Sequence, residues 1–171
     1  MTTEWLSNEQ QQAWRSYLLA TTLLTDRLDR DLRAKHDVSL PEYEILVRLS
    51  ESPDRSLRMA ELADSVKNSR SRITHTIARM ERSGLVMRQQ CPSDGRGVVA
   101  SLTDEGWATL NRAAPDHVAS VRAALISVVS DDDFMAIGRA FAAVAEGLED
   151  GDPDPVLSPR RRRRQPAAAP V

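Results

Sequence analysis

The sequence is poor in cysteine and has no long apolar run. Its single cysteine, Cys91, cannot form a disulfide within the chain, and a metal site built from several cysteines is excluded. No stretch approaches the roughly 18 apolar residues that a membrane-spanning helix requires, and residues 1–12 lack the basic-then-apolar pattern of a secretory signal. We therefore expect a protein that stays in the cytoplasm and has no membrane partner.

The short motifs of several enzyme classes are also missing. The chain contains no glycine-rich phosphate loop, no Gly-x-Ser-x-Gly, no His-Glu-x-x-His and no Cys-x-x-Cys. The three histidines, His36, His75 and His117, are too scattered along the sequence to form a recognisable metal motif. These absences predict a chain that is not an enzyme and needs no cofactor or metal.

The composition is sufficient for a packed core. Hydrophobic residues make up 41% of the chain and charged residues 28%, which is close to the averages for soluble globular proteins. A length of 171 residues suits one domain, which we place at residues 1–150. Residues 151–171 are rich in proline, alanine and arginine, and this composition predicts a disordered basic tail.

The charges are distributed unevenly. Between Arg55 and Arg96 there are nine Lys/Arg and four Asp/Glu, and residues 160–164 are five consecutive arginines. The remainder of the chain is acidic, so that the formal net charge is -2. Binding to phosphates requires only that the contacting face is positive. The middle of the chain is therefore predicted to form a local surface for nucleic acid.

Hydroxyl side chains followed by acids or amides mark the expected helix starts. Ser7 with Gln10 and Ser39 with Glu42 are typical of capping boxes. Ser56 is the expected cap of a third helix, and Thr103 and Ser130 are the expected caps of the fifth and sixth. Apolar residues then recur at helical spacing. The expected helices cover about residues 7–36, 40–50, 59–66, 70–83, 104–129 and 131–149.

Two short strands are expected after the fourth helix, at residues 85–90 and 98–102. The segment between them contains proline, aspartate and glycine, which favour a hairpin with a turn at its tip. A helix-turn-helix followed by a hairpin predicts a fold that is mainly α with a small β-wing, a winged helix-turn-helix lobe at residues 55–103. Pro115 is expected to kink or divide the fifth helix, because proline removes a backbone donor.

The fourth helix carries two different faces. At about 100° per residue, Ile73, Ile77 and Met80 form an apolar stripe that can pack on the preceding helix. The polar face is then available for the major groove of duplex DNA, although any surface helix can have a charged face. Arg79 is expected to contact either phosphate or an acidic partner. The residues of this helix assigned to DNA are Arg70, Ser71, Arg72, Thr74, His75 and Arg79.

The tip of the hairpin is the second candidate for DNA contact. Arg96 lies between two glycines, and its guanidinium can reach a narrow, A·T-rich minor groove. Asp94 can hold Arg96 in position through a charge-assisted hydrogen bond. An ordinary hairpin turn has the same composition, but its place after a helix-turn-helix favours DNA.

Five short motifs resemble the MarR family of transcription regulators. They are Met59-Ala-Glu-Leu-Ala63, Ser69-Arg-Ser-Arg-Ile-Thr74, Arg79-Met-Glu-Arg-Ser-Gly-Leu-Val86, Asp94-Gly-Arg96 and Ser101-Leu-Thr-Asp-Glu-Gly106. They follow the order and spacing of the family, and the resemblance spans about residues 7–150. It implies a homodimer on a pseudo-palindromic operator, with dimerisation helices at residues 7–36 and 104–149, and a wing whose arginine enters the minor groove while the aspartate braces it.

The resemblance also implies a small phenolic or carboxylate effector, bound between the dimerisation helices and the DNA-binding lobe. Candidate contacts are Trp14, Arg15, His36 and Tyr43, which offer aromatic walls and hydrogen-bond donors for an anion. Helix packing, or for His36 a solvated helix end, is the alternative role of each. Cys91, just before the wing, is either a redox sensor or a small packing residue.

Apolar side chains near both ends of the chain leave two interpretations open. They can pack against a second copy, or they can close a core within one chain. The set comprises Trp14, Tyr17, Leu18, Phe134, Ile137, Phe141, Val144 and Leu148.

The function also has two interpretations. The first is a sequence-specific regulator, in this family usually a repressor; the alternative is an architectural protein that binds nucleic acid without sequence preference through Arg160 to Arg164.

Overall fold

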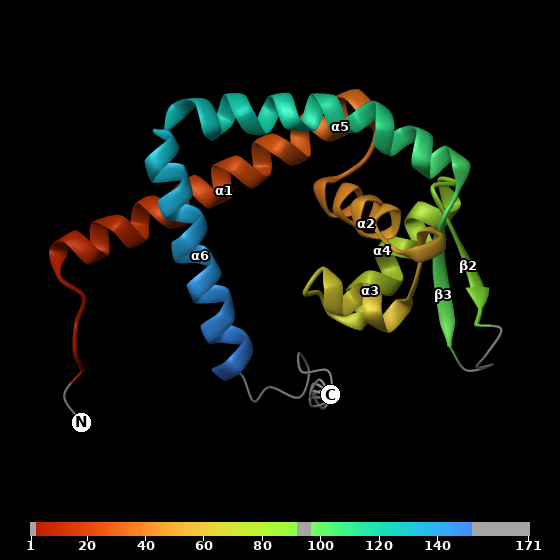
Figure 1. Cartoon of the computed structure of the whole chain (residues 1–171), viewed down its shortest axis with the longest axis horizontal. Coiled ribbons are helices and arrows are strands. Elements are labelled where there is room, and N and C mark those ends of the chain that lie inside the picture. Colours follow the sequence, from red (N-terminus) through yellow and green to blue (C-terminus); the bar gives the residue numbers. More distant parts are fainter. Residues whose placement is uncertain (1–2, 92–96, 152–171) are drawn as a thin grey trace, which may run out of the picture.

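The computed structural model describes residues 3–91 and 97–151, with side chains up to residue 149 (Figure 1). It is mainly helical with a small antiparallel sheet, which confirms the predicted fold class. In chain order the elements are α1 (Asn8–His36), α2 (Leu40–Ser50), the 3-10 turn η1 (Pro53–Arg55), β1 (Ser56–Arg58), α3 (Met59–Ser65), α4 (Arg70–Arg82), β2 (Val86–Gln90), β3 (Val98–Leu102), α5 (Asp104–Ala124), the 3-10 turn η2 (Ile126–Val128) and α6 (Asp131–Gly151).

The predicted helix starts at both ends of the chain are confirmed. The Ser7 hydroxyl accepts the Gln10 N–H at 3.1 Å, and the Gln10 side chain accepts the Ser7 N–H at 2.8 Å. Ser39, Thr103 and Ser130 cap α2, α5 and α6 with their hydroxyls. Each cap satisfies a backbone donor that the first turn of a helix leaves without a partner.

The three strands form one sheet in the order β1-β3-β2, and both pairs are antiparallel. The prediction that Ser56 caps α3 is wrong. Ser56 instead lies opposite Ser101 in β1, with its hydroxyl bonded to the Ser101 hydroxyl at 2.8 Å. The Glu61 carboxylate accepts the Arg58 N–H at 3.4 Å where α3 begins. A three-residue strand is too short for alternating polarity to show in the sequence.

The core lies inside the lobe that α2, α3, α4 and the sheet form with the end of α1 and the first half of α5. Its most buried large side chains include Leu32, Ile45, Leu46, Leu49, Leu62, Ile73, Ile77 and Met80. The first twenty residues of α1 contribute no buried residue, and among the described side chains α6 contributes none either. The first part of α1 and the described side chains of α6 therefore have no core within one chain.

Helices α1 and α5 lie side by side and form an arch that carries the lobe at one end (Figure 1). The N-terminal half of α1 extends away from the lobe, whereas α6 runs down from the arch on the same side as the lobe (Figure 1). Glu149 near the end of α6 is paired with Lys67 of the lobe at 2.8 Å. Of the two outcomes predicted for Pro115, a kink or a division of the fifth helix, the division does not occur, because α5 runs unbroken from Asp104 to Ala124. Pro115 and Asn111 are both exposed, so water can bond the Asn111 carbonyl that the proline leaves without a donor. None of the described helices is long and apolar enough to cross a membrane.

Candidate nucleic-acid interface

Helix α4 is fixed at both of its ends. Before it, the Asn68 N–H donates to the Ala63 carbonyl at 3.0 Å, and the Ser69 hydroxyl accepts the Arg72 N–H at 3.3 Å. After it, Gly84 has a φ of 73°, in the left-handed region in which a glycine commonly ends a helix. The short turn before α4 and the glycine after it together fix the position of both ends of α4 within the lobe.

The two predicted faces of α4 are confirmed. Ile73, Ile77 and Met80 are all at most 2% exposed and lie in the core. The opposite face is solvent-exposed, and Ser71, Arg72 and His75 point along it. The residues that were assigned to DNA on this helix are all classed as exposed: Arg70, Ser71, Arg72, Thr74, His75 and Arg79. Their contact with DNA stays a prediction.

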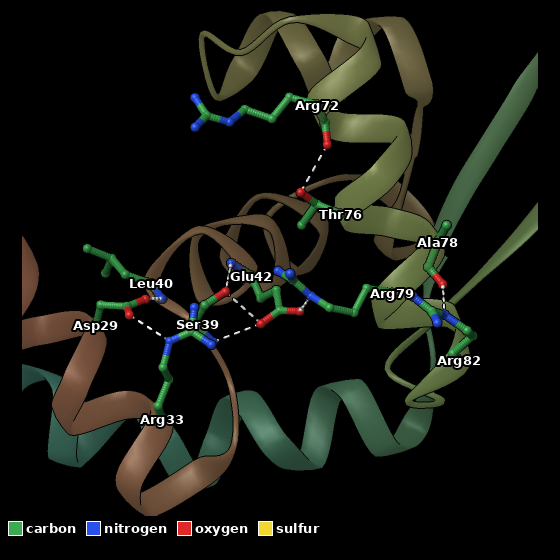
Figure 2. A network of polar contacts seen from close by, with 10 residues as sticks. All are labelled: Asp29, Arg33, Ser39, Leu40, Glu42, Arg72, Thr76, Ala78, Arg79 and Arg82. Carbon is green, nitrogen blue, oxygen red and sulfur yellow. Dashed lines mark hydrogen bonds and ion pairs between the residues drawn. The ribbon is translucent and has the colours of Figure 1, made fainter.

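Arg79 has a partner within the protein (Figure 2). Its Nε donates to Oε1 of Glu42 at 2.7 Å, and the side chains of Arg79 and Glu42 are 51% and 9% exposed. Of the two expectations for Arg79, the acidic partner is therefore the one seen. Glu42 was expected only to cap its own helix, and the sequence held no signal that linked it to α4.

The environment of Glu42 keeps it ionised. Burial alone raises the pKa of its carboxyl, but hydrogen bonds from Ser39 and Arg79 outweigh burial, so the pKa lies below its usual value. The same balance holds at Asp29 of α1. Burial opposes ionisation there too, whereas bonds from Arg33 and from the Leu40 N–H lower the pKa. Both carboxylates are charged at neutral pH.

The base of the predicted wing is the hairpin of β2 and β3. The Cys91 N–H donates to the Gly97 carbonyl at 2.7 Å, and the Cys91 side chain is buried. Arg88 of β2 is bonded through its Nε to the Glu81 carboxylate of α4 at 2.9 Å, which ties the hairpin to the helix. Asp94 and Arg96, the predicted wing contacts, lie outside the described residues.

The four predicted effector contacts fall into two groups. Trp14 stacks on Tyr17 with ring centroids 5.4 Å apart, and Arg15 is its exposed neighbour on α1. His36 lies at the other end of α1, about 33 Å away at 1.5 Å per residue, where its Nε2 contacts Asp116 at 2.9 Å. Tyr43 is buried near that end. One chain therefore does not bring the four residues into a single pocket.

The group near His36 includes residues that the sequence did not single out. A surface cavity of about 350 Å³ is lined by Arg33, Ala34, Lys35, His36, Asp37, Thr109 and Arg112. Close by, the rings of Tyr43 and His117 lie 4.5 Å apart. Burial lowers the pKa of His117 and raises that of Tyr43. The buried Nδ1 of His117 has no hydrogen-bond partner among the described residues.

Known proteins share both the sequence pattern and the fold. The sequence profile of the MarR family matches residues 38–98. One similar structure is the crystal structure, in complex with DNA, of Sco3205, a MarR family transcriptional regulator from Streptomyces coelicolor. Its sequence is 45% identical to this chain and the TM-score is 0.87, with 91% of this chain and 97% of that chain covered. AbsC, a MarR family transcriptional regulator from the same organism, is 42% identical with a TM-score of 0.82, over 86% and 99%.

A curated relative also has a named role. The homoprotocatechuate degradative operon repressor of Escherichia coli is 37% identical over 84 residues, which are 49% of this chain and 55% of the repressor. A helix-turn-helix, a following β-hairpin and an exposed polar face on the second helix define a winged helix-turn-helix protein. Within that class, the chain belongs to the MarR family of transcriptional regulators.

Proposed function

We propose that the chain is a sequence-specific repressor that binds duplex DNA in the cytoplasm as a homodimer. The observation that carries the proposal is the exposed polar face of α4, opposite its buried stripe of Ile73, Ile77 and Met80. An α-helix with such a face fits the major groove, where base edges are distinguishable. The DNA in the Sco3205 crystal and the repressor role of the E. coli relative support this function.

Six side chains of α4 are the proposed DNA contacts. Ser71, Arg72 and His75 suit base edges or nearby phosphates, since recognition helices usually enter the groove by their N-terminal half. Arg70 and Thr74 suit the flanking phosphates, and Arg79, whose side chain is 51% exposed, lies on the same helix. Asp94 and Arg96 would add the minor-groove contact.

Selection from a pool of random duplexes tests the proposal. A homodimer with two recognition helices predicts an enriched pseudo-palindrome with half-site centres one helical turn apart, about 10 base pairs. The duplex recovered in this way serves as the operator in the experiments below. A pool that shows no enrichment after repeated rounds contradicts sequence-specific binding.

The apolar surface of a single chain favours the dimer. Large apolar side chains of α1 and α6 are exposed, among them Trp14 at 52%, Leu23 at 59%, Val144 at 56% and Leu148 at 67%. Trp14, Tyr17 and Phe141 contact one another in series, so part of this exposed apolar surface is contiguous. Monomeric proteins rarely leave large contiguous apolar patches in water. Of the two interpretations drawn from the sequence, these exposures favour packing against a second copy. We place dimerisation in residues 7–36 and 104–149, and DNA binding in residues 55–103.

A charge in this apolar surface should separate the protomers. Phe141 of α6 is 43% exposed and contacts Tyr17 of α1 with ring centroids 5.4 Å apart. We expect Phe141→Glu to raise the dimer dissociation constant by about 100-fold or more, because an unpaired buried charge costs about 3–5 kcal/mol. Sedimentation of the variant measures this. Arg139→Glu, on the opposite side of α6, should stay dimeric, and a dimeric Phe141→Glu would place the interface elsewhere.

A small anionic effector is the second part of the proposal. The cavity beside His36 is lined by the basic side chains of Arg33, Lys35 and Arg112. Each is paired with one acid of the chain, Asp29, Asp116 or Glu105, and the remaining N–H donors of these cations suit a carboxylate. Trp14, Arg15 and Tyr43 remain proposed contacts, with the first two at the far end of α1.

Hydroxybenzoate isomers are suitable probes of the effector site. We expect at least one isomer to release the operator, and Arg112→Gln to raise the concentration needed by about tenfold through loss of one charge-assisted bond. Fluorescence anisotropy of labelled operator measures the release. Arg122→Gln, on the same helix but outside the cavity, is the control, and equal release from both variants would remove Arg112 from the site.

A further inference from the structure

A chain of polar contacts runs from the dimerisation helix α1 to α4 (Figure 2). Asp29 of α1 accepts the Arg33 Nε–H at 2.6 Å and, through Oδ1, the backbone N–H of Leu40 at 2.8 Å. Leu40 is the first residue of α2. Asp29 thus accepts a backbone N–H in the first turn of α2 that has no partner within that helix. The positive end of the α2 dipole favours a carboxylate at this place.

The series of polar contacts continues at Ser39, the residue before Leu40, and from there to Glu42. Glu42 accepts hydrogen bonds through both of its carboxylate oxygens. Oε2 accepts the Ser39 N–H at 2.8 Å and the Ser39 hydroxyl at 2.6 Å. Oε1 accepts the Arg79 Nε–H at 2.7 Å. One buried carboxylate therefore joins the start of α2 to the second half of α4, two elements 37 residues apart in the sequence.

The position of Arg79 on α4 allows its bond with Glu42 to affect the orientation of the DNA-facing side chains. Arg72 and Arg79 are seven residues apart, which brings them to nearly the same side of a helix with 3.6 residues per turn. Figure 2 shows the guanidinium of Arg72 extending from α4 with no partner drawn, whereas that of Arg79 turns to Glu42. A bond that holds Arg79 therefore restrains the rotation of α4 about its axis, and that rotation decides where Ser71, Arg72 and His75 point.

We propose that Glu42 is a positioning residue for α4, which sets operator preference through Arg79 without touching DNA. The inference rests on the proposed function, in which α4 reads the operator. A buried carboxylate is costly to leave without its partner, so the rotation of α4 that keeps the Glu42–Arg79 bond is favoured over others. Binding to phosphates in general needs less exact placement than binding to base edges.

Glu42→Gln separates positioning from electrostatics. Glutamine at the third helical position retains the capping bond to Ser39 but removes the charge that holds Arg79. Removal of a negative charge near α4 should by itself strengthen binding to every duplex. Positioning predicts the opposite for the operator: a loss of about tenfold, within the range measured for coupled side chains, with binding to random duplex within about twofold of wild type.

Glu44→Gln is the matched control. Glu44 lies on the same helix, is exposed and has no hydrogen bond or ion pair among the described residues, so it makes the same change in charge without affecting Arg79. Operator binding by this variant should equal or exceed that of wild type. Sedimentation and thermal unfolding of each full-length variant establish that it is a folded dimer, and binding is compared between folded variants.

A second comparison tests whether Glu42 acts through Arg79. If it does, Glu42→Gln in an Arg79→Met background should weaken operator binding by less than about twofold further. The inference is overturned if Glu42→Gln binds the operator as well as Glu44→Gln does, or if its loss is undiminished beside Arg79→Met. A wild-type chain that does not distinguish operator from random duplex would instead contradict the proposed function, before any variant is compared.

Discussion

Gly106→Ala should lower the free energy of unfolding by about 2 kcal/mol. A Cβ at this position would lie 2.0 Å from the Leu85 carbonyl oxygen and 2.7 Å from Leu102 Cδ1. The first of these atoms is backbone and cannot turn aside, so α5 must move away from the end of α4. Such overpacking costs about 1–3 kcal/mol and sometimes more, and it outweighs the roughly 1 kcal/mol by which alanine favours a helix over glycine.

Chemical denaturation at a fixed protein concentration measures this effect, because the stability of a dimer depends on concentration. Gly147→Ala makes the same substitution in α6, where an added Cβ meets no atom within 4 Å. That control should be unchanged or slightly more stable. A Gly106→Ala protein as stable as wild type would mean that α5 does not need its close approach to Leu85.

Arg72→Glu should weaken operator binding by about 100-fold or more. Arg72 is exposed in the N-terminal half of α4, and its guanidinium points away from the lobe. Loss of an arginine contact to base or phosphate costs about 1–3 kcal/mol, and a carboxylate in its place adds repulsion from the phosphates. Stability should change little, because exposed substitutions usually alter it by about 0.5 kcal/mol or less.

Arg122→Glu is the charge-matched control for this prediction. Arg122 is exposed near the end of α5, outside the predicted DNA-binding lobe. Its reversal makes the same change in net charge, so it reports the long-range effect of charge on DNA binding. Anisotropy titrations of both variants give the comparison. Equal losses for the two variants would argue that net charge, and not the face of α4, governs binding.

Local signals in the sequence predicted most of the helix starts and the two faces of α4. Ser7, Ser39 and Thr103 each satisfy a neighbouring backbone donor, so their role depends only on residues within one helical turn. The buried stripe of α4 was equally accessible, because helical geometry fixes which residues share a face. These features follow from spacing along the chain, and the structure confirms them.

Features that depend on distant partners could not be predicted in the same way. β1 exists because Leu57 lies opposite Ala100 on β3, which no pattern within three residues reveals. Pro115 is tolerated inside α5 because it faces solvent. The orientation of a helix relative to its neighbours decides both cases, and local sequence does not specify that orientation.

The candidate site shows the same division. The sequence predicts Arg79 on the fourth helix with phosphate or an acid as its partner, but the acid itself, Glu42, comes from α2 and meets Arg79 only in the folded chain. The four effector candidates were grouped by chemistry, and α1 then separates Trp14 from His36 by its length. Residue type indicates what a side chain can bind, whereas the fold decides which side chains meet.

Competition between the selected operator and random duplex, with salt varied, tests the central claim most directly. If α4 reads base edges, the full-length protein should prefer the operator by about 1,000-fold or more. Binding to random duplex should fall steeply with salt, because it consists mainly of phosphate contacts. Equal competition by random duplex, with both affinities falling in parallel as salt rises, would contradict sequence reading by α4.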